Sequence, residues 1–255
     1  MSKPSLKTTD LTINFGGHVA VNRISLEFYP GELTVIVGPN GAGKTTYFNL
    51  ISGQLNASEG LVEKDGIDIT KLSPSQRAHN GIGRAFQLTN LFPHLTVLEN
   101  VRLATQANSG DGWHFFRSVS GFNELISKAS IYLKATKLTN FASMTSASLS
   151  HGDQRKLEVA MLMAMEPDIY MFDEPTAGMG MDHTPFVLEL IANLKKDKSK
   201  TILLVEHKME VVKALADRIV VLHNGELVAD GQPTEVMNSQ IVADVYLGTT
   251  GINKQ

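Results

Sequence analysis

Cysteine is absent from the 255-residue sequence, which excludes disulfide bonds and catalysis by a thiol. Long apolar runs are absent as well, since no segment approaches the roughly 20 consecutive apolar residues that a bilayer-crossing helix needs. The amino-terminal MSKPSLKTTD lacks the apolar centre of a signal peptide. We therefore expect a chain that neither spans a membrane nor is exported by that route, and that suits a reducing compartment.

An excess of one charge is also missing. The sequence has 26 acidic and 23 basic residues, a formal net charge of −3, and no basic block of the kind that neutralises a phosphate backbone. We therefore expect no nucleic acid partner. A hydrophobic content of 42% in 255 residues allows a sizeable core, as one large domain or two lobes.

The patterns that are present indicate a mixed α/β fold. Short alternating runs near the start, LTINF and HVAVNRISLEF, predict antiparallel strands. Continuous apolar runs, LTVIV (33–37), IYMF (169–172) and TILLV (201–205), are typical of strands that are covered on both faces. Three such strands predict a parallel sheet.

Two further segments complete this outline. Residues 96–165 are mostly helical in pattern, and we interpret them as a helical unit inserted into the α/β core. Near the end, RIVVLHNGELVADG predicts a hairpin, because Asn224 and Gly225 are favoured in two-residue turns.

The segment GPNGAGKTT lies between a predicted strand and a predicted helix and satisfies the P-loop pattern G-x-x-x-x-G-K-[ST]. Glycines let the backbone curl around phosphates, and the exposed N–H groups and helix N-terminus attract negative charge. Lys44 is expected to reach the terminal phosphates, and the Thr45 hydroxyl to meet Mg²⁺. The sequence therefore predicts a nucleoside triphosphate site. Its residues are Gly38, Pro39, Asn40, Gly41, Ala42, Gly43, Lys44, Thr45 and Thr46.

The strand IYMF ends in two adjacent carboxylates, Asp173 and Glu174, followed by Pro175. A P-loop site needs a second strand whose tip delivers a carboxylate to Mg²⁺, and Asp173 is the candidate. Neighbouring side chains on a strand point to opposite faces, so Glu174 is free to face the γ-phosphate and polarise the attacking water. The alternative interpretation is a solvated strand end with two surface acids.

The stretch LSHGDQRKLEVAMLMAM predicts a helix that begins after Ser150, with Asp153 at capping-box spacing. It also has the features of an ordinary capped core helix. Gly152, however, costs stability in the first turn, and a position without a side chain lets a ligand approach the helix N-terminus closely. Phosphate is the natural ligand there.

Five motifs, in order, resemble the nucleotide-binding subunits of ATP-binding cassette (ABC) transporters over nearly the whole chain: GPNGAGKTT, GRAFQL, LSHGDQ, IYMFDEP and LLVEH. The resemblance implies an α/β fold: a P-loop NTPase (RecA-like) core with an antiparallel β subdomain and an inserted helical subdomain. It implies ATP and Mg²⁺ as cofactors and ATP hydrolysis coupled to transport. Within a single domain 1–255, the nucleotide-binding core is expected at about 5–90 and 166–240, the helical subdomain at about 91–165, and a short extension at 241–255.

The resemblance also implies roles for single residues. Ser150 and Gly152 would contact the γ-phosphate of ATP bound to the opposite subunit. Gln87 would touch Mg²⁺ and the attacking water and link the helical unit to the membrane partner, and His207 would hold the γ-phosphate. Phe15 would stack on adenine, although it could equally belong to the core of the first strands.

Three positions depart from the family pattern. His151 replaces a glycine of the LSGGQ signature, Asp153 replaces its glutamine, and Gly180 stands where an aspartate often couples the two sites. Communication between subunits is therefore expected to differ, while catalysis is expected to survive.

The implied partners are a second ABC ATPase subunit, identical or related, two membrane permease subunits and, indirectly, an external substrate-binding protein. The chain would be cytoplasmic and peripheral on the inner face of the cell membrane. FGGHVAVN, LFPHLTVLENV and LLVEHKMEVV further resemble the ATPases of branched-chain amino acid uptake systems. A urea or amide importer, a lipid exporter and a soluble ABC ATPase stay open as alternatives, whereas a GTPase would need an [NT]-K-x-D stretch, which is absent.

Overall fold

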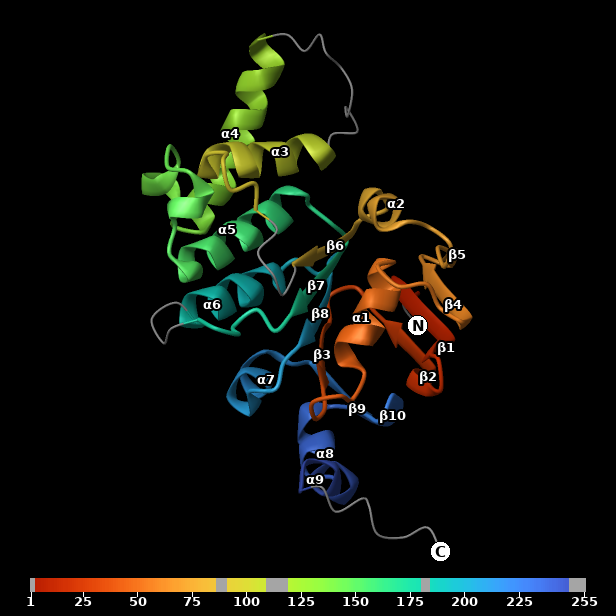
Figure 1. Ribbon diagram of the computed structural model, residues 1–255. Coiled ribbons are helices and arrows are strands. Elements are labelled where there is room, and N and C mark those ends of the chain that lie inside the picture. The colour runs from red at the N-terminus through yellow and green to blue at the C-terminus, as the bar shows by residue number, and fades with distance from the viewer. Residues whose placement is uncertain (1–2, 86–90, 109–118, 180–183, 248–255) are drawn as a thin grey trace, which may run out of the picture.

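The computed structural model describes residues 3–85, 91–108, 119–179 and 184–247. In this part of the chain a six-stranded sheet has the order β10-β9-β3-β8-β7-β6 (Figure 1). All of its neighbouring strands pair in parallel except β10, which is antiparallel to β9. Its strands are β3 (Leu33–Val37), β6 (Ile82–Ala85), β7 (Ile169–Asp173), β8 (Thr201–Val205), β9 (Arg218–His223) and β10 (Glu226–Gly231). The predicted parallel sheet is thus confirmed, with two further parallel strands at β6 and β9.

A second sheet is antiparallel and has the strand order β2-β1-β4-β5. The predicted amino-terminal pair is confirmed, because β1 and β2 are antiparallel, with register irregularities between Thr8 and Asn14. The strands of this sheet are β1 (Leu6–Phe15), β2 (His18–Phe28), β4 (Glu59–Lys64) and β5 (Ile67–Asp68).

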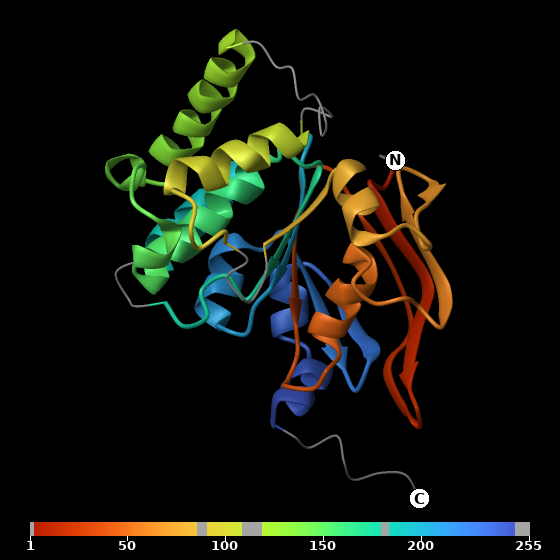
Figure 2. The ribbon, with the colours of Figure 1, turned by 45° about the horizontal axis from the view of Figure 1, so that its top comes forward.

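The helix α1 (Lys44–Ser52) lies between the two sheets, as Figure 2 shows. Its apolar side chains share a core with the antiparallel sheet and with one face of the parallel sheet, which includes Ile36 and Met171. The alternate residues of the same strands, such as Val35 and Phe172, pack against helices on the other face. Burial on both faces explains why these strands read as unbroken apolar runs.

The remaining helices flank the two sheets or form a separate group. Helices α3, α4 and α5 pack on one another around a third apolar cluster, which includes Val101, Leu133 and Leu157. A capping box fixes the start of α3: Thr96 Oγ1 accepts from the Glu99 N–H at 3.1 Å, and the Glu99 carboxylate accepts from the Thr96 N–H at 3.0 Å. These helices and the others are α2 (Pro74–His79), α3 (Val97–Asn108), α4 (Val119–Ala135), α5 (His151–Ala164), α6 (Thr184–Leu194), α7 (Met209–Leu215), α8 (Pro233–Met237) and α9 (Gln240–Leu247), with short 3₁₀ turns at Thr139–Phe141 and Ser146–Ser148.

The predicted hairpin near the carboxyl end joins β9 to β10. His223 pairs with Glu226, so the loop consists of the two residues Asn224 and Gly225. Their φ angles are 50° and 79°, the left-handed values that a type I′ turn requires.

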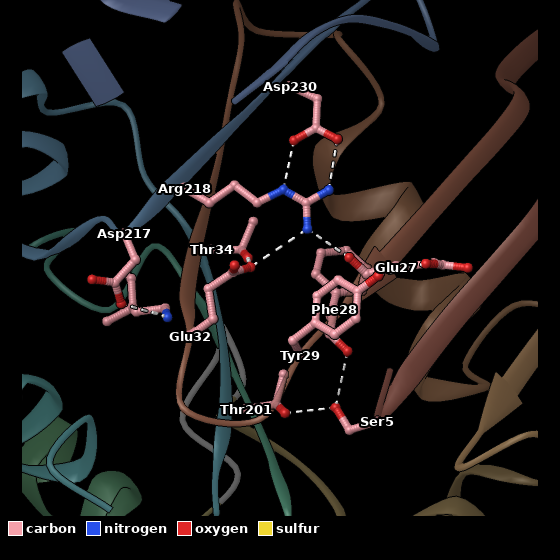
Figure 3. Close-up of polar contacts among 11 residues, drawn as sticks. Ser5, Glu27, Phe28, Tyr29, Glu32, Thr34, Thr201, Asp217, Arg218 and Asp230 are labelled. Atoms are coloured by element: carbon pink, nitrogen blue, oxygen red, sulfur yellow. Dashed lines mark hydrogen bonds and ion pairs between the residues drawn. The ribbon is translucent and has the colours of Figure 1, made fainter. Parts of the chain in front are cut away.

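Arg218, the first residue of β9, ties the two sheets together (Figure 3). Two of its guanidinium nitrogens donate to the Asp230 carboxylate at 2.6 Å each, and a third donates to the Glu27 carbonyl at 2.6 Å. Nearby, the buried hydroxyl oxygens of Ser5 and Thr201 lie 2.6 Å apart and join the start of β1 to the start of β8. These polar contacts set the position of the antiparallel sheet relative to the parallel one.

Within the described residues, no helix is both long and apolar enough to pass through a bilayer. The boundaries expected for the core, helical subdomain and extension stay predictions.

Candidate functional site

Three of the motifs found in the sequence meet at one edge of the parallel sheet. Because β3, β7 and β8 run in parallel, their carboxyl ends lie side by side. The P-loop follows β3, the Asp173-Glu174 pair ends β7, and His207 comes shortly after β8. In open α/β sheets, ligands bind outside the carboxyl ends of the strands.

Two P-loop glycines occupy positions that no other residue fits. A Cβ on Gly38 would lie 2.1 Å from the Leu222 carbonyl oxygen, and one on Gly43 would lie 2.5 Å from the Ala20 carbonyl oxygen. Their φ angles of 150° and 94° also favour glycine. The tight curl of the loop therefore depends on the missing side chains and on strands that pack behind it.

Lys44 lies within this curl, with 7% of its surface exposed. Its amine donates to the carbonyls of Gly38 at 2.6 Å and Pro39 at 3.0 Å. Burial lowers the pKa of the Lys44 amine, and the nearby carboxylates of Glu174 and Asp173 partly oppose this by raising it. The loop thus holds a buried cation before any phosphate arrives.

A cavity of about 390 Å³ opens over the P-loop. It brings together most of the predicted nucleotide-binding residues, including Phe15 from β1 and Glu174 from the end of β7. His18 and Ala20, which sequence reasoning missed, also line it; strand alternation places both on one face of β2 and was the available signal. The full lining is Phe15, His18, Ala20, Asn40, Gly41, Ala42, Gly43, Lys44, Thr45, Thr46 and Glu174.

Six predicted residues are described but do not line this cavity. Two of them are Gly38 and Pro39, whose carbonyls accept from the Lys44 amine. The others are Asp173, His207, Ser150 and Gly152.

Asp173 is 1% exposed and lies at the tip of β7. Its Oδ2 pairs with Arg84 Nη2 at 2.7 Å, while its Oδ1 is buried and has no hydrogen-bond partner among the residues that the structure describes. The same part of the chain holds no group of three or more potential metal-binding side chains. One available carboxylate oxygen with the Thr45 hydroxyl suits Mg²⁺ that arrives with phosphates, since Mg²⁺ is seldom held by an all-protein cage.

Glu174 lies just beyond the end of the strand. Because β7 ends at Asp173 and Glu174 adopts a left-handed conformation with φ 49°, the direction of its side chain is set by this turn and not by strand alternation. Its N–H donates to the Val205 carbonyl at 3.0 Å, and its side chain is 20% exposed and lines the cavity. Strained backbone of this kind clusters at functional sites.

His207 lies beside Glu174, with its Nδ1 3.7 Å from the Glu174 Oε1. The neighbouring Glu206 is buried and was missed by sequence reasoning: its carboxylate accepts from the Thr176 hydroxyl at 2.5 Å and from the His207 N–H at 3.0 Å. Glu206 therefore links the segment that follows β7 to the segment that follows β8.

Ser150 and Gly152 lie at the start of α5, away from the cavity lining. As predicted, Ser150 is the N-cap: its Oγ accepts from the Asp153 N–H at 3.2 Å. Ser150 and His151 are exposed, whereas Gly152 is buried. The Ser150 side of this helix start is therefore open to another molecule. Gln87 and Gly180 lie outside the described residues.

The P-loop, the paired carboxylates and the parallel sheet define the class of protein, a P-loop nucleotide-binding ATPase. Residues 21–177 match the family model described as ABC transporter, and the chain belongs to this family. It is an ATP-binding and ATP-hydrolysing member, as the sequence motifs predicted.

Individual relatives agree with this assignment. The chain is similar to the high-affinity branched-chain amino acid transport ATP-binding protein LivG of Escherichia coli K12, at 38% identity over 97% of this chain and 99% of that one. Among solved structures, it is similar to MJ1267, an ATP-binding cassette of an ABC transporter, in its ADP conformation: TM-score 0.81, 29% identity, 96% of this chain and 99% of that one. It is also similar to the dimeric structure of MJ0796, a bacterial ABC transporter cassette: TM-score 0.77, 29% identity, 89% of this chain and 98% of that one. These likenesses confirm the predicted fold class.

Proposed function

We propose that this chain is the ATP-hydrolysing subunit of an importer for branched-chain or other small amino acids. The observation that carries the ATPase role is the convergence of the P-loop, Asp173-Glu174 and His207 at one sheet edge. The substrate class rests on the likeness to the E. coli branched-chain amino acid protein, which extends over 97% of this chain. A urea or amide importer, a lipid exporter or a soluble ABC ATPase is the alternative.

In this proposal the cavity holds ATP. The Phe15 ring, which is 50% exposed at the end of β1, stacks on adenine. The P-loop amides and the N-terminus of α1 bind the phosphates, and Lys44 exchanges its contacts with the Gly38 and Pro39 carbonyls for phosphate oxygens.

Asp173 and Thr45 would hold Mg²⁺, with Gln87 as a further ligand. When bound, the ion neutralises charge that develops on the phosphates. Asp173 suits this role because it is buried and offers one oxygen that has no hydrogen-bond partner among the described residues.

Glu174 polarises the attacking water. Its side chain enters the cavity from the turn after β7, and His207, 3.7 Å away, is placed to hold the γ-phosphate and to orient the Glu174 carboxylate. The Glu206 contacts to Thr176 and to the His207 N–H keep these two segments at a fixed spacing.

The exposed start of α5 serves a second cassette. Ser150, with the buried Gly152 behind it, would contact the γ-phosphate of ATP in a partner subunit, which is either a copy of this chain or a related ATPase. The dimeric cassette MJ0796 supports such pairing. The cycle of pairing and separation would act on two permease subunits at the inner face of the cell membrane, with an external binding protein contributing indirectly.

The Glu174→Gln substitution tests this function. It removes the base but not the nucleotide contacts, so the variant should bind ATP, lose about 10²–10⁴-fold in turnover and accumulate as a pair. Equilibrium ATP binding, phosphate release and sedimentation measure these properties. Glu189→Gln, a change at an exposed carboxylate on α6, is the control and should match wild type. Wild-type turnover in Glu174→Gln would remove Glu174 from this role.

The transported substrate is tested in cells. A strain carrying the Glu174→Gln chain should lose uptake of labelled leucine and keep uptake of urea, and two hydrophobic subunits should co-purify with the chain from membranes. Unchanged leucine uptake with lost urea uptake would overturn the amino-acid assignment and leave the ATPase role standing.

A further inference from the structure

Arg84 lies on β6, and its side chain reaches the Asp173 carboxylate through the protein interior. Its side chain is 6% exposed, and its Nη2 donates to the Asp173 Oδ2 at 2.7 Å. The Asp173 side chain has no exposed surface. The pair is therefore a buried salt bridge between two neighbouring strands of the sheet.

The other end of the Arg84 guanidinium is fixed to the P-loop helix. Its Nη1 donates to the Asn49 Oδ1 at 2.6 Å and to the Ser52 Oγ at 2.9 Å. The guanidinium carbon also lies 5.6 Å from the centre of the Phe48 ring. A planar, rigid guanidinium bound at both ends leaves the Asp173 carboxylate little freedom to rotate.

Arg77 shows what a purely structural arginine looks like in this molecule. It is more deeply buried, at 2% exposed, and also contacts α1, but the described hydrogen bonds of its guanidinium go to backbone carbonyls only: those of Leu50, Ile51, Thr70 and Leu72. The described hydrogen bonds of Arg84 go to side chains only, those of Asn49, Ser52, Gln54 and Asp173. Arg77 thus binds backbone at the end of α1, whereas Arg84 joins side chains of α1 to the Asp173 carboxylate.

We propose that Arg84 is a positioning residue for the metal: by holding Asp173 Oδ2, it presents the unpaired Oδ1 to Mg²⁺ and fixes it relative to α1, which carries Thr45. This inference rests on the proposed magnesium role of Asp173. Groups that orient a metal ligand in this way commonly change metal affinity by about 10–100-fold when they are removed.

The test compares nucleotide binding with and without the ion. Arg84→Met keeps an apolar stem against Phe48 but cannot hold the carboxylate. We expect it to lower the affinity for ATP with Mg²⁺ by about 10–100-fold and to leave the affinity for ATP with EDTA unchanged. Calorimetric titration in the Glu174→Gln background, where hydrolysis is removed, measures both affinities. An equal fall in the two affinities, or no fall in either, would overturn the proposal.

Arg77→Met is the matched control. It removes a buried arginine of the same helix neighbourhood, so it should lower the melting temperature without changing the ratio of the two affinities. Arg84→Lys keeps the charge but loses the forked guanidinium, which can bind two groups at once. Its ratio of ATP affinities with and without Mg²⁺ should lie between those of wild type and Arg84→Met. If Arg84→Met does not fold, Arg84→Lys carries the test, and a wild-type ratio in it would count against the proposal.

Asp173→Asn separates this inference from the function beneath it. If Asp173→Asn loses the preference for ATP with Mg²⁺ while both Arg84 variants keep it, the positioning role is wrong and the magnesium role of Asp173 stands. If Asp173→Asn keeps that preference, the proposed magnesium role of Asp173 fails first.

Discussion

The two helix N-termini that the sequence associates with phosphate, those of α1 and α5, are built in different ways. The N-cap of α1 is Gly43, which has no side chain to cap the helix, and Lys44 is buried at the first helical position. The N-cap of α5 is Ser150, which satisfies the Asp153 N–H with its own hydroxyl. The α1 start lines a cavity beside Glu174, whereas the α5 start does not line that cavity.

This difference indicates what each terminus needs. At α1, the buried Lys44, the P-loop amides and the Glu174 carboxylate gather at one cavity within one chain. At α5, Ser150 and His151 are exposed and lie outside that cavity. In the proposed function, the first terminus binds the phosphates of ATP and the second closes the ATP site of a partner subunit.

The largest effect on ATP hydrolysis is expected at the start of α1, from a change at Lys44. Lys44→Ala removes the buried cation from the loop, and we expect hydrolysis to fall by about 10²–10³-fold, as for loss of a charge-stabilising donor. Steady-state phosphate release measures the fall. Lys213→Ala, on α7, is the control and should keep wild-type turnover; a Lys44→Ala chain with wild-type turnover would show that the amine has no part in phosphate binding.

At the start of α5, a change at Ser150 tests the pairing of two chains. Ser150→Asp retains a capping oxygen but adds negative charge, so ATP-driven pairing of Glu174→Gln chains should be lost while ATP binding to the single chain is kept. Sedimentation with ATP measures the pairing. Thr96→Ala, which removes the cap of α3, should lower the free energy of unfolding by about 1 kcal/mol and leave pairing intact. Full pairing in Ser150→Asp would mean that the α5 terminus does not meet the partner's nucleotide.

A smaller effect, on ATP affinity, is expected from a change at Phe15 in the cavity beside α1. Phe15→Ala removes the ring from the cavity and should weaken ATP binding by about 5-fold, in line with about 1 kcal/mol for an aromatic contact. Phe15→Tyr should bind ATP like wild type, because it keeps the ring. Equilibrium binding of ATP without Mg²⁺ measures both variants, and equal affinity in Phe15→Ala and wild type would remove Phe15 from the proposed adenine contact.

Arg218 should affect stability only. Arg218→Met breaks the contacts to Asp230 and to the Glu27 carbonyl, and we expect the free energy of unfolding to fall by about 1.5–3 kcal/mol, as for hydrogen bonds of charged groups. Nucleotide affinity below the melting transition should stay at the wild-type value. Urea unfolding and ATP titration test the two statements, and a selective loss of ATP affinity would place this junction in the nucleotide site.

Much of the architecture followed from local chemistry. The unbroken runs of β3, β7 and β8 identified doubly covered strands, Asn224-Gly225 identified the hairpin, and Ser150 identified a cap. Each of these signals depends on residues that are close in the sequence. The P-loop and the Asp173-Glu174 pair are local signals of the same kind.

The features that were missed depend on distant contacts. Nothing near Arg84 in the sequence indicates that its guanidinium reaches Asp173 and Asn49, and nothing near Glu206 indicates that its carboxylate meets Thr176. The conformation of Glu174 was missed for a related reason, because strand alternation was extended one residue beyond the end of β7.

The packing behind the P-loop has a consequence for folding during synthesis of the chain. The carbonyl of Leu222 and the turn at Gly225 lie against Gly38 and Gly43, and the Gly225 N–H donates to the Ala42 carbonyl at 3.1 Å. The loop leaves the ribosome well before the strand and turn that pack behind it, because Leu222 and Gly225 come far later in the sequence than Gly38 and Gly43. A nascent chain therefore has the residues of its ATP site long before it can assemble that site, and ATP binding would report that the carboxyl-terminal hairpin has docked.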